Sequence, residues 1–94
     1  MATDLTEMWR RCFTQWPEEI ERRGVVVTNF DEQIAFEAFA ASPEMVVVER
    51  RAPDTVGGRT VVIPYQSILA VKIVSVVKLR AFKSLGFEAP PPRK

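Results

Sequence analysis

One stretch decides the expected fold of this 94-residue chain, Thr60-Val-Val-Ile-Pro-Tyr-Gln-Ser-Ile-Leu-Ala-Val-Lys-Ile-Val-Ser-Val-Val-Lys-Leu79. It is rich in β-branched residues, which favour strands. Proline has no N–H group for a strand ladder, so Pro64 marks the end of a short strand over 60–64. Apolar residues then alternate along 68–79, which predicts a longer strand with two distinct faces. Two strands joined at a tight polar corner are typical of a small, twisted β-barrel.

Residues 4–16, before this stretch, predict an amphipathic helix. Its apolar residues follow helical spacing and are Leu5, Met8, Trp9, Cys12, Phe13 and Trp16. Asp4 is placed to cap the helix, with Glu7 at the third helical position. A helix this short needs its apolar stripe buried. We therefore expect it to cover one end of the barrel, and the alternative is that the stripe docks a partner.

Three further strands are predicted between the helix and the central stretch, over about 24–30, 33–41 and 45–51. The middle one rests on the alternation of Ile34, Phe36 and Ala38, although its alanine and glutamate content leaves a helix as the competing interpretation. The chain thus predicts a single domain over 1–87, mostly β with an N-terminal helix. A flexible proline-rich tail is expected over 88–94.

The charge of the chain is unevenly distributed, although its net value is only +1. Residues 1–50 carry 5 basic and 10 acidic side chains, whereas residues 51–94 carry 8 basic and 2 acidic ones. Such a chain could make head-to-tail contacts or carry one basic face, unless both halves are simply solvated. The only cysteine is Cys12, so no internal disulfide can form. With neither a signal peptide nor an apolar membrane span recognisable, we expect a cytoplasmic protein.

Catalytic chemistry is poorly represented in the sequence. There is no histidine, which is the commonest general base and metal ligand. No cysteine spacing suits zinc, and Gly57-Gly58 indicates a turn rather than a phosphate-binding loop. Cys12 lies on the apolar stripe of the helix, where a structural role is expected. We therefore expect no enzyme, no metal and no cofactor.

Two segments resemble the motifs of the Sm-like (LSm) family, which includes the bacterial RNA chaperone Hfq. Ile63-Pro-Tyr-Gln-Ser-Ile-Leu-Ala-Val71 is similar to the second motif, and Ser42-Pro-Glu-Met-Val-Val-Val48 stands where the first motif would be. The likeness covers about residues 4–75 and implies a five-stranded, strongly bent, SH3-like barrel. Pro43 or Glu44, and Val46, stand where the first motif usually has Asp and Asn, and Tyr65 and Gln66 stand in place of the histidine of the bacterial chaperone. The chain would thus be a divergent member.

The resemblance implies that the protein assembles with itself into a ring of roughly five to eight subunits, which would act as a protein-binding scaffold. Strand edges would then join neighbouring subunits through Val61, Val62, Ile63, Leu69, Val71 and Ile73. The alternative function is binding of single-stranded RNA. Tyr65 would stack on a base and Gln66 would contact a base edge, with phosphate contacts from Arg50, Arg51, Arg59 and Lys72. The competing interpretation is that Tyr65 packs on a neighbour and the arginines are merely solvated. An accessory enzyme subunit is a third class, disfavoured by the missing histidine.

Overall fold

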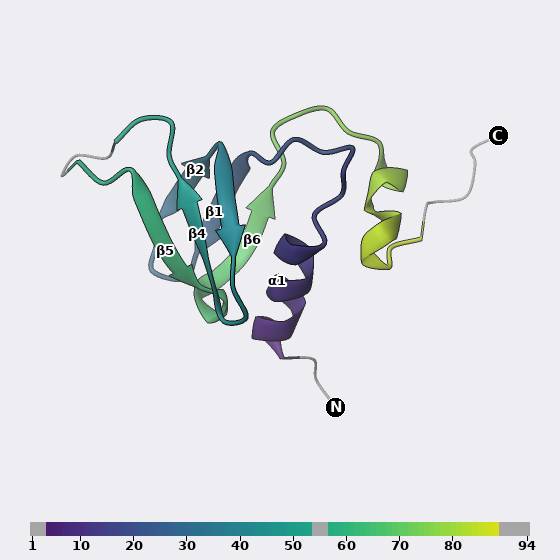
Figure 1. Ribbon diagram of the computed structural model, residues 1–94, viewed down its shortest axis with the longest axis horizontal. Helices are drawn as coiled ribbons and strands as arrows, with labels where there is room; N and C mark the ends of the chain where they lie inside the picture. Colours follow the sequence, from purple (N-terminus) through teal and green to yellow (C-terminus); the bar gives the residue numbers. More distant parts are fainter. Residues whose placement is uncertain (1–3, 54–56, 89–94) are drawn as a thin grey trace.

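The computed structural model describes residues 4–53 and 57–88, and Figure 1 shows one α-helix beside a group of short strands. The elements, in chain order, are α1 (Leu5–Thr14), β1 (Gly24–Thr28), β2 (Gln33–Phe36), β3 (Ala38–Ala41), β4 (Met45–Glu49), β5 (Thr60–Pro64), the 3₁₀ helix η1 (Tyr65–Ser67), β6 (Ile68–Lys72) and the 3₁₀ helix η2 (Leu79–Leu85). The helix expected over 4–16 is therefore present. The tail expected over 88–94 lies, from residue 89 onward, outside the described residues.

The strands form two three-stranded antiparallel sheets, with the orders β2-β1-β6 and β3-β4-β5. Neither sheet is closed into a barrel. The prediction of a five-stranded, strongly bent barrel is therefore wrong. The two strands of the 60–79 stretch belong to different sheets, since β5 pairs with β4 and β6 pairs with β1. Alternation in the sequence shows which side chains share a face, but it does not show which strand lies alongside.

The single strand predicted over 33–41 is divided at Glu37 between the two sheets. β2 pairs with β1, with Ala35 opposite Val25, and β3 pairs with β4, with Phe39 opposite Val48. The Glu37 amide already belongs to the second sheet, because it donates a hydrogen bond to the Glu49 carbonyl at 2.9 Å. The strand interpretation of this segment is confirmed against the helical one. The prediction of one continuous strand over 33–41 was wrong, because the chain changes partner strands at Glu37.

The strand predicted over 68–79 is also shorter than expected and ends at Lys72. Its partner β1 begins at Gly24, which lies so close to the Lys72 carbonyl that an added Cβ would collide with it. Residues 73–78 continue beyond that point without belonging to a strand, although inward and outward side chains still alternate. β1 and β4 likewise each end two residues before their predicted limits, at Thr28 and Glu49.

Helix α1 packs against β3, β4 and η1 rather than against the end of a barrel. Asp4 caps it, accepting a hydrogen bond from the Thr6 amide at 3.1 Å. Phe13 is buried and meets the Phe39 ring edge-on at 5.0 Å between ring centroids. The buried apolar core brings together both ends of the chain and both sheets; it consists of Phe13, Trp16, Ile20, Val26, Ile34, Phe36, Val46, Val48, Ile63, Tyr65, Ile68 and Ala81.

Candidate functional site

Tyr65 opens η1 directly after β5, and its side chain belongs to the core. The residue is 0% exposed, its ring stacks on Phe13 at 6.1 Å, and its hydroxyl donates a hydrogen bond to the Ser42 carbonyl at 2.8 Å. Burial raises the pKa of the phenol, and the nearby charge of Arg10 opposes that rise. The ring thus has no exposed face on which a nucleotide base could stack. The interpretation that Tyr65 packs on neighbouring side chains describes what is observed.

Apart from Lys72 on β6, the residues expected to contact RNA lie at the two ends of the β4–β5 hairpin rather than in one pocket. Arg50 and Arg59 lie at one end, where the Arg50 amide donates to the Arg59 carbonyl at 2.6 Å. Arg51 belongs to the same group, since its carbonyl accepts a hydrogen bond from the Arg59 guanidinium at 3.3 Å. Gln66 is exposed beyond the other end of β5. A five-residue strand, about 17 Å long, separates the two groups.

The electrostatic surroundings of these cations differ. The Arg50 guanidinium is half-buried, 3.9 Å from the Glu32 carboxylate, and its Nε donates to the Ala52 carbonyl at 3.4 Å. Lys72 is exposed at the end of β6 and donates to the Gln33 side chain at 3.2 Å across β1. Arg51 and Arg59 are exposed. Arg59 also donates to a carbonyl, that of Arg51. The arginines therefore differ in burial and in partners, and they do not form a uniform basic surface.

The residues expected at an oligomer interface lie on β5, on β6 and just beyond β6. Val62 and Leu69 are 58% and 62% exposed, whereas Ile63 is 1% exposed and belongs to the core. Val61, Val71 and Ile73 are half-buried against that core. Each strand is the last of its sheet, so in the described part of the chain its outer edge has no strand partner. The structure thus leaves two strand edges that carry exposed apolar side chains.

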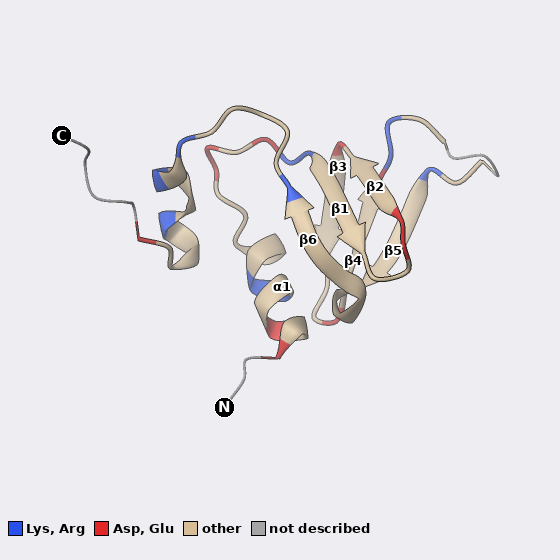
Figure 2. Ribbon diagram, turned by 180° about the vertical axis from the view of Figure 1, so that it is seen from behind, with Lys and Arg blue, Asp and Glu red and all other residues tan. Residues whose placement is uncertain are grey.

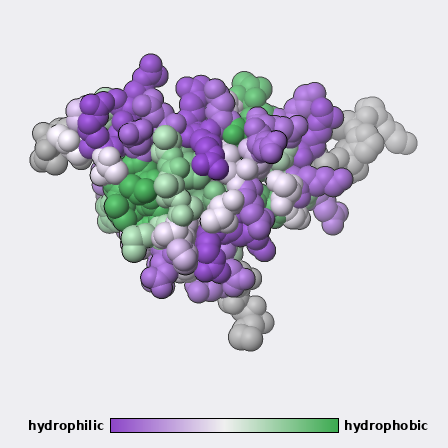
Figure 3. Space-filling model, viewed as in Figure 1, coloured by the Kyte–Doolittle hydropathy of each residue, from purple (hydrophilic) through white to green (hydrophobic). Residues whose placement is uncertain are grey.

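The outer face of the β3-β4-β5 sheet adds an apolar surface that sequence reasoning did not identify. Val47 lies opposite Ala40 on one side and opposite Val62 on the other, so these three side chains form one row across the sheet. Figure 3 shows this surface as a hydrophobic area over β4 and β5. The signal was available in the run Val46-Val47-Val48, because a strand with one wet face would carry a polar residue at its centre.

Comparisons with protein-family models, with curated proteins and with solved structures give no match to this chain. The likeness to the Sm-like family therefore stays a prediction from the two motif segments.

Reactive groups are sparse in the part of the chain that the structure describes. No group of three or more potential metal ligands occurs among those residues, and none of their helices is long and apolar enough to cross a membrane. Cys12 is a free, half-buried thiol on α1, and burial raises its pKa. A raised pKa leaves less of the reactive thiolate at neutral pH. The surface features that stand out are therefore strand edges and apolar patches.

Proposed function

We propose that this protein is a non-enzymatic interaction module that assembles with copies of itself through the outer edges of β5 and β6. The observation that carries the proposal is that, in the described part of the chain, both edges lack a strand partner and carry an exposed apolar side chain, Val62 on β5 and Leu69 on β6. At the start of β6 the Ile68 carbonyl already accepts a hydrogen bond from the Trp9 indole at 3.1 Å, so a partner strand would pair with the rest of β6. Unpaired edges are templates for strands of another chain, and natural monomers usually block them with charged residues or proline. Here β5 carries a proline only at its last residue, Pro64.

A second copy is the partner that fits both edges at once. The β5 edge of one subunit can pair with the β6 edge of the next, and such a head-to-tail contact leaves another edge free for a further subunit. The row formed by Ala40, Val47 and Val62 is continuous with the β5 edge, so pairing there would also cover part of the hydrophobic surface in Figure 3. Repeating this contact gives a closed ring if the rotation between neighbouring subunits adds up to a full turn. We place this assembly in the cytoplasm, where the free Cys12 would remain reduced.

Light scattering after gel filtration tests the proposal, with the protein at tens of micromolar. We expect the parent chain to be an oligomer, and we expect Val62→Lys and Leu69→Lys to shift it to monomers because a lysine on the edge must stay solvated. Val76→Lys is the matched control, since Val76 is fully exposed outside both strands. A monomeric parent chain would overturn the proposal. So would edge variants that assemble like the control.

Binding of single-stranded RNA is a second candidate, favoured by basic side chains near the C-terminal end of the described chain. Lys78, Arg80 and Lys83 are exposed along η2 and just before it, where Figure 2 marks basic residues in blue on the ribbon. They make no ion pair with another described residue. Titration of U-rich and A-rich oligonucleotides at several salt concentrations measures this function. Replacing all three by glutamine should reduce the logarithmic salt slope by about 2 if each contacts a phosphate. No binding at low salt would exclude it.

A further inference from the structure

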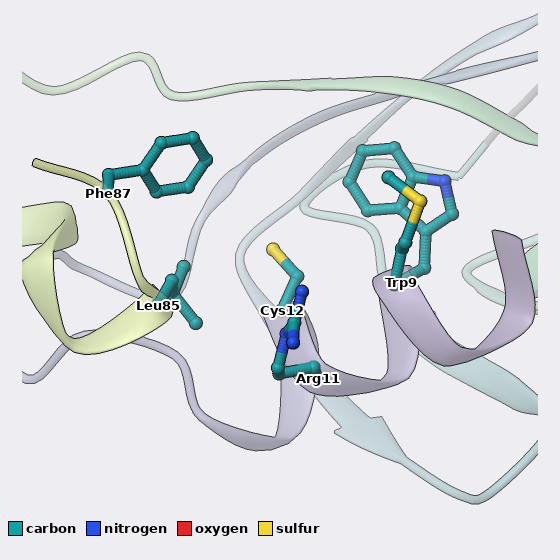
Figure 4. Close-up of a pocket in the computed structure, with 6 residues that line it drawn as sticks. Trp9, Arg11, Cys12, Leu85 and Phe87 are labelled. Carbon is teal, nitrogen blue, oxygen red and sulfur yellow. The ribbon is translucent and has the colours of Figure 1, made fainter. Parts of the chain in front are cut away.

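An apolar groove lies between α1 and the C-terminal end of η2 with the residues that follow it. One cavity of about 180 Å³ is lined by Met8, Trp9, Arg11, Cys12, Leu85 and Phe87. Figure 4 shows Trp9 and Cys12 rising from the helix, with Leu85 and Phe87 across from them. The walls come from distant parts of the sequence, which explains why no sequence motif indicated this site.

A second cavity of about 130 Å³ shares Trp9, Cys12, Leu85 and Phe87 with the first. It extends inward to Val71 and Ile73 at the end of β6 and to Phe82 of η2. All residues that line this inner cavity are apolar or are the thiol of Cys12. The two cavities thus form one slot that is open at the helix surface and becomes wholly apolar toward the sheet.

The outer end of the slot carries a single charged residue, Arg11, in the last turn of α1. Its side chain is exposed and makes neither a hydrogen bond nor an ion pair with any other described residue. Arg10, one residue earlier, differs because its guanidinium donates to the Pro43 carbonyl at 3.3 Å. Glu88 lines a neighbouring depression that shares Phe87 with the groove. Glu7 lies one turn before Arg11 on α1 and makes no ion pair with it. An apolar slot with one unpaired guanidinium at its mouth complements a molecule that has a hydrocarbon chain and an anionic head.

We propose that this groove binds a medium-chain fatty acid. The carboxylate would pair with the Arg11 guanidinium, and the chain would lie between Trp9 and Leu85 and reach toward Val71. A planar guanidinium matches a carboxylate with two parallel hydrogen bonds, which fixes the head group at the mouth. The narrow apolar interior accepts methylene groups and has no partner for a second polar group. Binding in the groove does not require self-assembly, although its inner end at Val71 and Ile73 adjoins the β6 edge that the proposed assembly would use.

The single cysteine provides a direct assay on the full chain, because Cys12 lines both cavities and no other thiol can react. The rate at which an aromatic disulfide reagent labels Cys12 would be measured with increasing dodecanoate, below its micelle concentration. We expect dodecanoate to slow labelling at saturation. Affinity should rise about fourfold for each methylene added from octanoate upward, until the slot is filled. Equilibrium dialysis of dodecanoate gives the same dissociation constants independently of the thiol.

Two matched pairs of variants test the two halves of the site. Arg11→Gln should weaken dodecanoate binding about tenfold, whereas Arg51→Gln removes the same charge at the remote hairpin end and should change nothing. Phe87→Ala should weaken binding similarly, with Phe30→Ala as its control because both rings are exposed and Phe30 lies at the β1–β2 turn. Thermal unfolding of each variant would verify that the fold is retained.

Several outcomes would overturn the proposal. Dodecylammonium that protects Cys12 as well as dodecanoate would show that Arg11 does not select the head group. Equal affinities for octanoate and dodecanoate would show that the chain does not enter the slot. Co-sedimentation with anionic vesicles, without any binding of monomeric dodecanoate, would instead assign the surface to membrane lipids. No binding in dialysis would exclude a fatty-acid site altogether.

Discussion

Two consecutive segments of this chain, Ile68–Lys72 and residues 73–78, have the same sequence character but different structures. Both contain β-branched residues, and exposed and half-buried side chains alternate from Ala70 through Lys78. The first is β6, hydrogen-bonded to β1. The second has no ladder partner among the described residues, and Val76 within it is 103% exposed. Alternating burial therefore indicates an extended backbone, whereas a strand also requires a neighbouring backbone with which it can form hydrogen bonds.

A similar contrast in burial distinguishes α1 and the two sheets from residues 73–88, which contribute only Ala81 to the buried core. α1 and the two sheets bury their apolar side chains jointly, whereas η2 lies apart from the sheets in Figure 1 and buries only Ala81 fully. Stability should therefore be concentrated in the first region, because each buried side chain contributes and each exposed one contributes little. Matched substitutions in the two regions measure this difference directly.

The largest difference in stability is expected between alanine substitutions of Phe13 in the core and Phe87 near the C-terminus. Phe13→Ala removes a buried ring that contacts Trp16, Phe39 and Tyr65, so we expect a loss of about 3–5 kcal/mol in the free energy of unfolding. Phe87→Ala removes an exposed ring, and its cost should stay within about 0.5 kcal/mol. Urea unfolding of both variants measures the pair. Equal losses would show that the C-terminal segment is as tightly integrated as the core.

A valine pair should give the next effect. Val26, at the centre of β1, is completely buried, so Val26→Ala should cost about 2–3 kcal/mol. Val76→Ala leaves no cavity and should be within about 0.5 kcal/mol of the parent chain. The same urea titration applies. A destabilising Val76→Ala would indicate that residues 73–78 are covered in solution, for instance by another copy.

Gly24 lies opposite the end of β6, where the strand stops and residues 73–78 begin. A substitution there should have the next largest effect on stability. Gly24→Ala places a methyl group against the Lys72 main-chain oxygen, which forces β1 and β6 apart at a cost of about 1–3 kcal/mol. Truncation of the Lys72 side chain should not relieve this loss, because the obstacle is main chain. Restored stability in the Gly24→Ala, Lys72→Ala double variant would contradict the assigned contact.

The smallest predicted effect concerns the pH dependence of the buried Tyr65. Because burial raises the pKa of this phenol in the folded chain, the stability it contributes is present below its ordinary pKa of about 10 and is lost as pH rises above that value. Tyr65→Phe should cost about 1 kcal/mol at neutral pH, since the Ser42 carbonyl loses its donor. The same substitution should also reduce the loss of stability that occurs as the pH rises above about 10. Urea midpoints at neutral and strongly alkaline pH measure both, and an unchanged decline would assign it to other groups.

The candidate surfaces were only partly foreseeable. Val62 and Leu69 were selected as interface residues from the motif resemblance, and both are exposed on edge strands. Tyr65 was assigned a binding role for its place in a polar corner, yet the corner folds inward under α1 and Phe13 covers the ring. The groove between α1 and η2 could not be foreseen, because Trp9 and Leu85 meet only when the chain returns past β6.

The sequence by itself determined the positions of α1 and most strands, because capping, apolar spacing and proline act over a few neighbouring residues. It also determined that Ile34 and Phe36 share an inward face, since side-chain direction follows from the pleat. Only the tertiary structure decided that the chain changes sheets at Glu37, that β5 and β6 lie in different sheets, and that the 68–79 strand ends at Lys72. Those outcomes depend on which backbones meet, and hydrogen bonds between distant segments leave no local pattern in the residues that form them.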